Sequence, residues 1–391
     1  MASTLATPSK PEGQVTALPG SVPWYVWCSV AAVTFAMAGV HWDISWHRSI
    51  GRDTFWTPAH ICIHICGVLA GITCGYLILS TTFNPRAALR DCSVAIWGFR
   101  GPLGAFIAAW GGIAMITSAP FDNWWHDAYG LDVKILSPPH MVLALGILAV
   151  HAGALILILG QMNRAAGPLR TRLRMLFLYV GGMTLVCLTV VQMEITTRIS
   201  MHTAHFYHLV SLVAPLVLCG VGRASQYRWG ATAVAGVYSL FVIAIGRILP
   251  LFPAEPKLGP VYHMVHEFVP PEWPVLVVVP AVLLDLLWER WPQWGLLRKA
   301  AASGAVFVAA LAAAQWPFAD FLASPWARNW FFGSNYFGYY VPDTSIFKRY
   351  GFLPTEQGAA FWQEWALALA AAIGLSLLGL AWGNWMRRIR R

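Results

Sequence analysis

An aspartate and two histidines near the start of this chain have a spacing that suits a metal ion. In the stretch HWDISWHRSIGRDTFWTPAHICIH, Asp43 is followed by His47 one helical turn later and by His60 after a short connection. Residues four apart lie on one face of a helix, so Asp43 and His47 can bind the same ion. Pro58 favours the first turn of the next helix, which would bring His60 to its start as the third ligand. We call these three residues the first triad.

The same order recurs in the stretch FDNWWHDAYGLDVKILSPPH, with one extra residue in the second gap. Asp122 and His126 are again four apart, and His140 again stands beside prolines that open an apolar segment. We call these three residues the second triad. One carboxylate with two imidazoles suits copper, zinc or non-haem iron rather than calcium or magnesium. The pattern predicts two metal sites and an internal repeat of two helix pairs.

The two triads resemble one protein family, the C subunit of the copper membrane monooxygenases that oxidise methane and ammonia. In that subunit one metal site is Asp-x3-His-x12-His, and an adjoining site is Asn-x3-His-x13-His. The first triad matches in residue type and spacing, whereas the second has Asp122 where the family has asparagine. An added carboxylate favours a harder or more highly charged metal, so the identity of the second ion stays open. The resemblance covers about residues 40–160 and implies copper; zinc or iron are the alternatives.

The composition indicates a protein that lies within a membrane. The chain has 391 residues, of which 58% are hydrophobic and 11% charged, with 21 tryptophans. We expect an all-α polytopic bundle of about ten transmembrane helices in the lipid bilayer. The expected apolar spans are 23–42, 58–80, 102–120, 139–160, 175–194, 205–222, 230–250, 274–289, 298–316 and 361–385.

The expected organisation is a short tail followed by one membrane domain. Residues 1–21 are polar and predict a disordered cytoplasmic tail, and 22–391 form the membrane domain. Within it, residues 22–160 hold the repeated helix pairs, and 161–391 add further helices with a long outer loop at about 317–358. The seven cysteines fall mostly in apolar runs and form no CxxC motif, so they predict packing residues.

The basic residues predict the orientation. Most of the 26 lysines and arginines fall on the side of the amino terminus, which places both termini in the cytoplasm, with a bacterial inner membrane as the expected location. Because they occupy short loops between spans, the net charge of +9 does not indicate nucleic-acid binding. All the histidines except His151 then fall near the opposite, outer helix ends, with Trp42, Trp46 and Trp124 as part of an aromatic belt.

Further histidines are secondary candidates for ligands. His202, His205 and His208 recur every three residues, as expected for one face of a helix start, and His263 and His266 precede a glutamate. Each group could instead be a solvated helix end. No phosphate loop, HExxH or covalent haem motif is present, although histidines on facing helices could hold haem without a covalent link.

Two functions follow as hypotheses. The first is a subunit of a copper monooxygenase-like oxidoreductase, which would act on a small apolar substrate together with other subunits. The second is a non-catalytic membrane protein that handles or transports copper or zinc. A carrier needs polar groups through the bilayer, and the spans contain few of them, chiefly His151, Asp285 and Glu194. This scarcity favours a fixed metal site; oligomerisation is compatible with either hypothesis.

Overall fold

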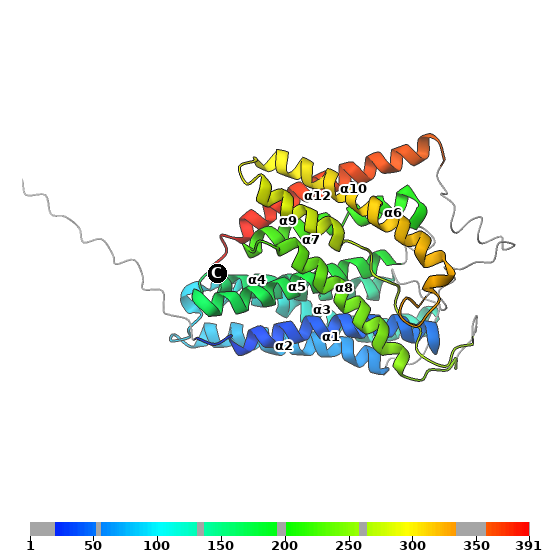
Figure 1. The fold of residues 1–391 in the computed structure, drawn as a ribbon. Helices are drawn as coiled ribbons and strands as arrows, with labels where there is room; N and C mark the ends of the chain where they lie inside the picture. The colour runs from blue at the N-terminus through cyan, green and yellow to red at the C-terminus, as the bar shows by residue number, and fades with distance from the viewer. Residues whose placement is uncertain are drawn as a thin grey trace, which may run out of the picture.

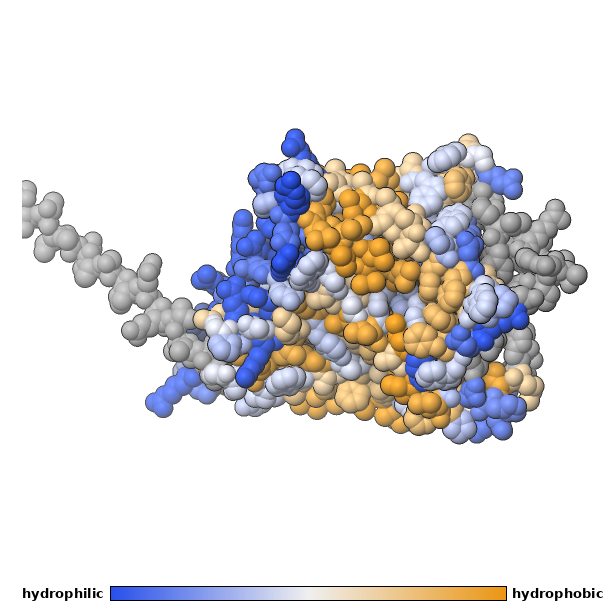
Figure 2. Space-filling model, viewed as in Figure 1, coloured by the Kyte–Doolittle hydropathy of each residue, from blue (hydrophilic) through white to orange (hydrophobic). Residues whose placement is uncertain are grey.

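The protein is an integral membrane protein built from apolar α-helices. The computed structural model describes residues 20–51, 56–130, 137–193, 201–257, 264–333 and 357–390. Nine helical segments within these ranges are long and apolar enough to cross a membrane. Figure 2 shows an apolar band between two more polar ends, as expected for such a bundle. The predicted tail lies almost wholly outside the described residues, as does the part of the predicted outer loop from 334 to 356.

The first four helices run alternately up and down and pack in a ring (Figure 1). They are α1 (Trp24–Ser49), α2 (Pro58–Phe83), α3 (Leu103–Tyr129) and α4 (Pro138–Met162). Each packs against the next, and α1 also contacts α4. A 3-10 turn, η1 (Arg90–Cys92), and a two-stranded hairpin of β1 (Val94–Ile96) and β2 (Phe99–Gly101) join α2 to α3. Because α1 and α3 point the same way, their ends meet the starts of α2 and α4 at one end of the bundle.

Glycines let α3 and α4 approach closely. A Cβ atom added to Gly153 would lie 2.6 Å from the backbone oxygen of Gly104, and one added to Gly111 would lie 2.7 Å from that of Gly146. Without side chains at these positions the two backbones come into contact, which is the usual way that helices pack tightly in a membrane. We call Gly104, Gly111, Gly146 and Gly153 the glycine seam. It fixes α3 against α4 and therefore fixes the distance between their ends.

The remaining helices form a second group that α5 joins to the first. Helix α5 (Gly167–Met193) contacts α1 and α4 on one side and α7 and α8 on the other. The second group consists of α6 (Ala204–Ser211), α7 (Ala214–Ser225), α8 (Gly230–Ile248), α9 (Val278–Arg290), α10 (Leu296–Ala323) and α12 (Ala359–Met386). Helix α12 packs against α6, α7 and α10, whereas α9 packs against α8 and α10. The 3-10 turns η3 (Leu249–Leu251) and η4 (Pro325–Ala327) extend α8 and α10.

The predicted spans differ from the structure in three places. The span expected at 274–289 is only the short α9, which is not among the nine spanning candidates, so the described residues hold nine spans where about ten were expected. The span at 205–222 is broken between α6 and α7, because Pro215 lacks the N–H that would continue the helix. Finally, α10 continues to Ala323 and takes up the first part of the expected outer loop.

Candidate metal sites

The first triad comes together at the junction of α1 and α2. Asp43 lies between the two histidines, with one carboxylate oxygen 3.1 Å from His60 Nε2 and the other 3.7 Å from His47 Nε2. One ligand atom from each of the three residues can be chosen so that all lie within 4.8 Å of one another. An ion held at about 2 Å from each nitrogen and oxygen would draw the ligand atoms of such a group to within about 4 Å of one another, a small adjustment of the side chains.

A helix cap positions His60. Pro58 stands in the first turn of α2, and the side chain of Thr57 accepts a hydrogen bond from the His60 backbone N–H at 3.1 Å. This cap satisfies one of the unpaired amides of a helix start and fixes the first turn. His60 thus stands at the start of α2, as the sequence predicted, facing the end of α1.

The second triad has a similar but wider arrangement at the junction of α3 and α4, where the ligand atoms do not all come within 4.8 Å of one another as those of the first triad do. Asp122 lies 3.5 Å from His126 Nε2 through one oxygen and 3.4 Å from His140 Nε2 through the other. Ser137 takes the place of the threonine cap and accepts from the His140 backbone N–H at 3.4 Å. The structure therefore assembles both predicted triads around an aspartate.

One carboxylate oxygen in each triad is buried and accepts no hydrogen bond within the described parts of the chain. It is Oδ1 of Asp43 in the first triad and Oδ1 of Asp122 in the second. Buried polar atoms are normally paired, because leaving one unpaired costs free energy. Each Oδ1 instead lies near an imidazole Nε2 that also offers a lone pair when the neutral ring carries its proton on Nδ1. A bound cation would satisfy these atoms together, so the donor set fits a transition metal.

The two triads are neighbours at the same end of the bundle. His64 lies one turn after His60 on α2 and is within electrostatic reach of both His60 and Asp122. Since α2 packs between α1 and α3, this histidine bridges the two groups.

A third cluster lies between α6 and α12. Glu364 Oε2 is 3.2 Å from Nδ1 of His205 and 2.9 Å from Nδ1 of His208. One ligand atom from each of these three residues also lies within 4.8 Å of the other two. The sequence singled out the two histidines but missed Glu364. Its distance in the chain explains this, because the glutamate follows His208 by 156 residues and no local spacing connects them.

The other secondary candidates that the structure describes, His202 and His266, do not join such a cluster. His202 lies 2.9 Å from Asp320 and is almost fully buried against Trp316. His266 is exposed. Among the described residues, it belongs neither to the first triad nor to the cluster around Glu364. His263 lies outside the described residues.

Two buried histidines have structural roles. His41 Nδ1 is 2.8 Å from the carbonyl of Met37, and His151 Nδ1 is 2.9 Å from that of Ile147. Each is one turn from its partner within the same helix. The seven cysteines are all free, in agreement with their predicted role as packing residues.

Comparison with known proteins does not identify the family of this chain or the role of its histidine clusters. No protein-family model, curated protein or solved structure matches the chain.

Proposed function

We propose that the protein is a membrane metalloprotein whose first and second triads each hold a metal ion, with copper as the first choice. The observation that carries this proposal is the buried Oδ1 of the central aspartate in both triads, which accepts no hydrogen bond within the described residues and faces a histidine Nε2. The matching arrangement also favours an origin of the two helix pairs as an internal repeat. The resemblance to the copper membrane monooxygenases then supports an oxidoreductase subunit.

In that role the two triads would differ from a closed structural zinc site. Three protein ligands leave positions open at the ion, which is typical of catalytic metals. Copper would supply the redox chemistry with dioxygen when bound. The chain's own contribution would be to hold the ion rigidly, with caps at His60 and His140 and with the glycine seam behind the second triad. An electron donor would have to come from a partner protein.

The structure gives little support to the alternative of a transmembrane metal carrier. His151 is fully buried and bonded to its own helix. The carboxylate of Asp285 caps the start of α8, accepting from the backbone N–H of Thr232 at 2.8 Å and from its hydroxyl at 2.7 Å. Both polar groups hold helices in place, and Glu194 lies outside the described residues. We therefore favour fixed sites over an ion path.

Metal analysis of the purified protein tests this proposal. Full-length protein prepared without chelator should contain metal by mass spectrometry, and the double variant His47→Ala/His126→Ala should lose most of it. Replacing the buried His41 with glutamine serves as the control, because this histidine belongs to neither triad. Unchanged metal content in the double variant would refute the proposal.

Electron paramagnetic resonance then distinguishes the ions and the functions. A copper(II) signal with nitrogen couplings that disappears in the His47 and His60 variants supports the oxygenase-like site. Binding of zinc alone would contradict it. Transport of metal into liposomes that persists without the triads and stops when His151 is replaced would establish the carrier instead.

A further inference from the structure

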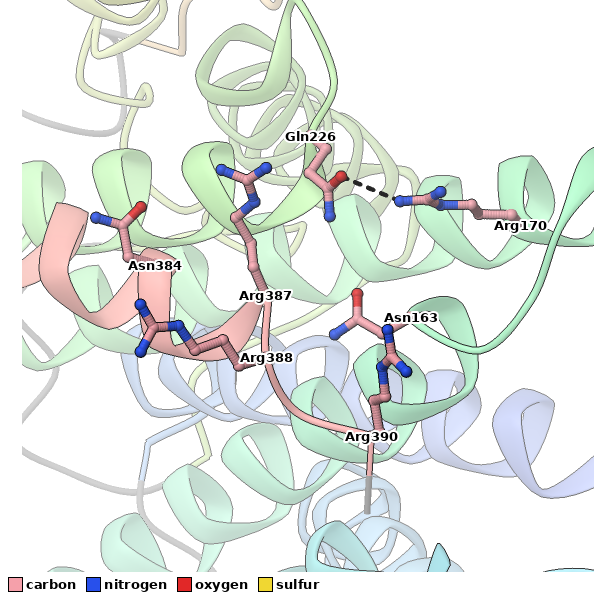
Figure 3. A pocket seen from close by; sticks show the side chains of 7 residues that line it. All are labelled: Asn163, Arg170, Gln226, Asn384, Arg387, Arg388 and Arg390. Atoms are coloured by element: carbon pink, nitrogen blue, oxygen red, sulfur yellow. Dashed lines mark hydrogen bonds between the residues drawn. The ribbon is translucent and has the colours of Figure 1, made fainter. Parts of the chain in front are cut away.

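A cavity lined by arginines lies at the other end of the bundle from the histidine clusters. Its volume is about 500 Å³, and Figure 3 shows it between the α4–α5 connection and the ends of α7 and α12. It is lined by Asn163, Arg170, Gln226, Asn384, Arg387, Arg388 and Arg390. His140 and Asn163 stand at opposite ends of α4, and at about 1.5 Å per residue the helix separates them by roughly 35 Å. The cavity is therefore independent of the proposed metal sites.

Amide side chains hold the walls of this cavity in place. Asn163 donates hydrogen bonds to the backbone carbonyls of Met386 at 3.1 Å and Ile389 at 2.7 Å, which ties the end of α12 to the end of α4. Gln226 accepts from the guanidinium of Arg170 at 3.0 Å and orients it, as Figure 3 shows. The arginines of the cavity thus project from a built frame and not from a loose chain end.

The backbone at Gln226 is also unusual. It has φ 54° and ψ 31°, in the left-handed region, which only one other non-glycine residue adopts among those that the structure describes. A side chain in this region costs free energy that glycine would avoid. Such conformations concentrate at functional sites, and here the strained residue is the one whose side chain positions Arg170.

Carboxylates do not balance the positive charge of the cavity. None of the lining residues is acidic, and Arg387 is close enough to Arg223 for their like charges to oppose each other. Two described carboxylates on α9, which packs against α8, have partners of their own, since Glu289 pairs with Arg228 at 2.9 Å and Asp285 caps α8. Gathering arginines in this way without a counter-ion is unfavourable, so an anion would stabilise the arrangement.

We propose that this cavity binds a phosphate group, carried either by the headgroup of an anionic phospholipid or by soluble phosphate. Guanidinium groups match phosphate oxygens with paired, charge-assisted hydrogen bonds. Basic pockets between helix ends at a membrane boundary suit phospholipid headgroups, and here apolar helices border the cavity. Arg170, Arg387 and Arg390 supply the contacts, and Gln226 is a positioning residue.

Native mass spectrometry of the delipidated full-length protein tests this site. The probes are phosphatidylglycerol, phosphatidylcholine and inorganic phosphate, each titrated into the same detergent. The native protein should bind phosphatidylglycerol more tightly than phosphatidylcholine. The variant Arg387→Gln/Arg390→Gln should bind it on the order of ten-fold or more weakly, at the strength expected per arginine near an anionic lipid.

A matched control removes the same charge outside the cavity. Arg172 and Arg290 are exposed and do not line it, and the double variant Arg172→Gln/Arg290→Gln should keep its binding within about two-fold. Melting temperatures measured in phosphatidylcholine check that both variants fold. Should the cavity double variant fail to fold, Arg390→Gln alone should weaken binding about five-fold.

The outcomes separate the two sources of phosphate. Displacement of phosphatidylglycerol by inorganic phosphate identifies soluble phosphate as a ligand, and retention of the lipid in excess phosphate identifies the lipid headgroup. The proposal is overturned if the protein binds neither phosphatidylglycerol nor inorganic phosphate. It is also overturned if the cavity and control variants lose affinity equally, or if Arg390→Gln binds phosphatidylglycerol as tightly as the native protein. None of these results depends on the metal content of the triads.

Discussion

Replacing Asp43 with asparagine separates the metal-binding role of the first triad from a merely structural one. The change keeps the size and shape of the side chain but removes the negative charge that faces His47 and His60. Without a metal, the carboxylate would only pair with these two imidazoles, at 3.7 and 3.1 Å. With a metal, it would be the single charged ligand of the site.

The two roles predict effects of different size. The Asp43 side chain is 22% exposed, and its histidine partners are 43% and 23% exposed, so solvent screens both pairs. Partly exposed pairs of this kind contribute at most about 1 kcal/mol each, so the melting temperature in chelator should fall only slightly. Losing an outer-shell partner of a metal ligand costs about 10–100-fold in affinity, so losing the ligand itself should cost at least about 100-fold.

Chelator competition measures this difference. Copper affinity is determined for the native protein, for Asp43→Asn and for the control Asp127→Asn, whose exposed carboxylate contacts Asn123 and no histidine of a triad. We expect the loss only in Asp43→Asn, together with a nearly unchanged melting temperature in chelator. An Asp43→Asn protein that competes with the chelator as well as the native protein would refute the assignment of this aspartate as a ligand.

Three further variants test other parts of the structure. Thr57→Ala removes the cap of α2, which should cost about 1 kcal/mol of thermal stability and weaken metal binding through His60, whereas Thr57→Ser should restore both. Glu364→Gln removes the charged acceptor shared by His205 and His208. In a protein whose two triads have been mutated, this substitution should remove the remaining bound metal. Equal metal content with and without it would exclude the cluster as a site. Gly153→Ala places a Cβ 2.6 Å from backbone atoms of α3 and should destabilise the protein by about 1–3 kcal/mol in thermal unfolding. The control Gly75→Ala, whose added Cβ meets open space, should not destabilise it. Equal melting temperatures of the two variants would contradict the close packing of α3 and α4.

Local spacing predicted the parts of the structure that depend on neighbouring residues. The i, i+4 pairs and the prolines beside His60 and His140 identified the helix ends that meet in each triad, because a helix fixes its own periodicity and caps. Length and apolar composition likewise predicted most of the spanning helices. The apolar span was expected to end at Pro120, and α3 continues past it to Tyr129, which places Asp122 and His126 on one helix as their spacing predicted.

Contacts between distant segments could not be predicted in the same way. Glu364 reaches the histidines of α6 only because α12 packs against α6, and no local sequence pattern in either helix predicts that packing. The arginines of the cavity were assigned to membrane orientation, since their gathering depends on how the ends of α4, α7 and α12 meet. The short α9 was taken as a span because its apolar run extends into residues before Val278 that are not helical.

The glycine seam bears on how quickly an ion could exchange at the second triad. Backbone contact between α3 and α4 leaves no room for a passage between these helices, and parting them would break contacts over several turns. The triad residues stand just where the seam ends, on the last turns of α3 and the first turn of α4. An ion bound there would therefore not exchange between α3 and α4, and its stepwise release by Asp122, His126 and His140 at the end of the bundle would set its residence time.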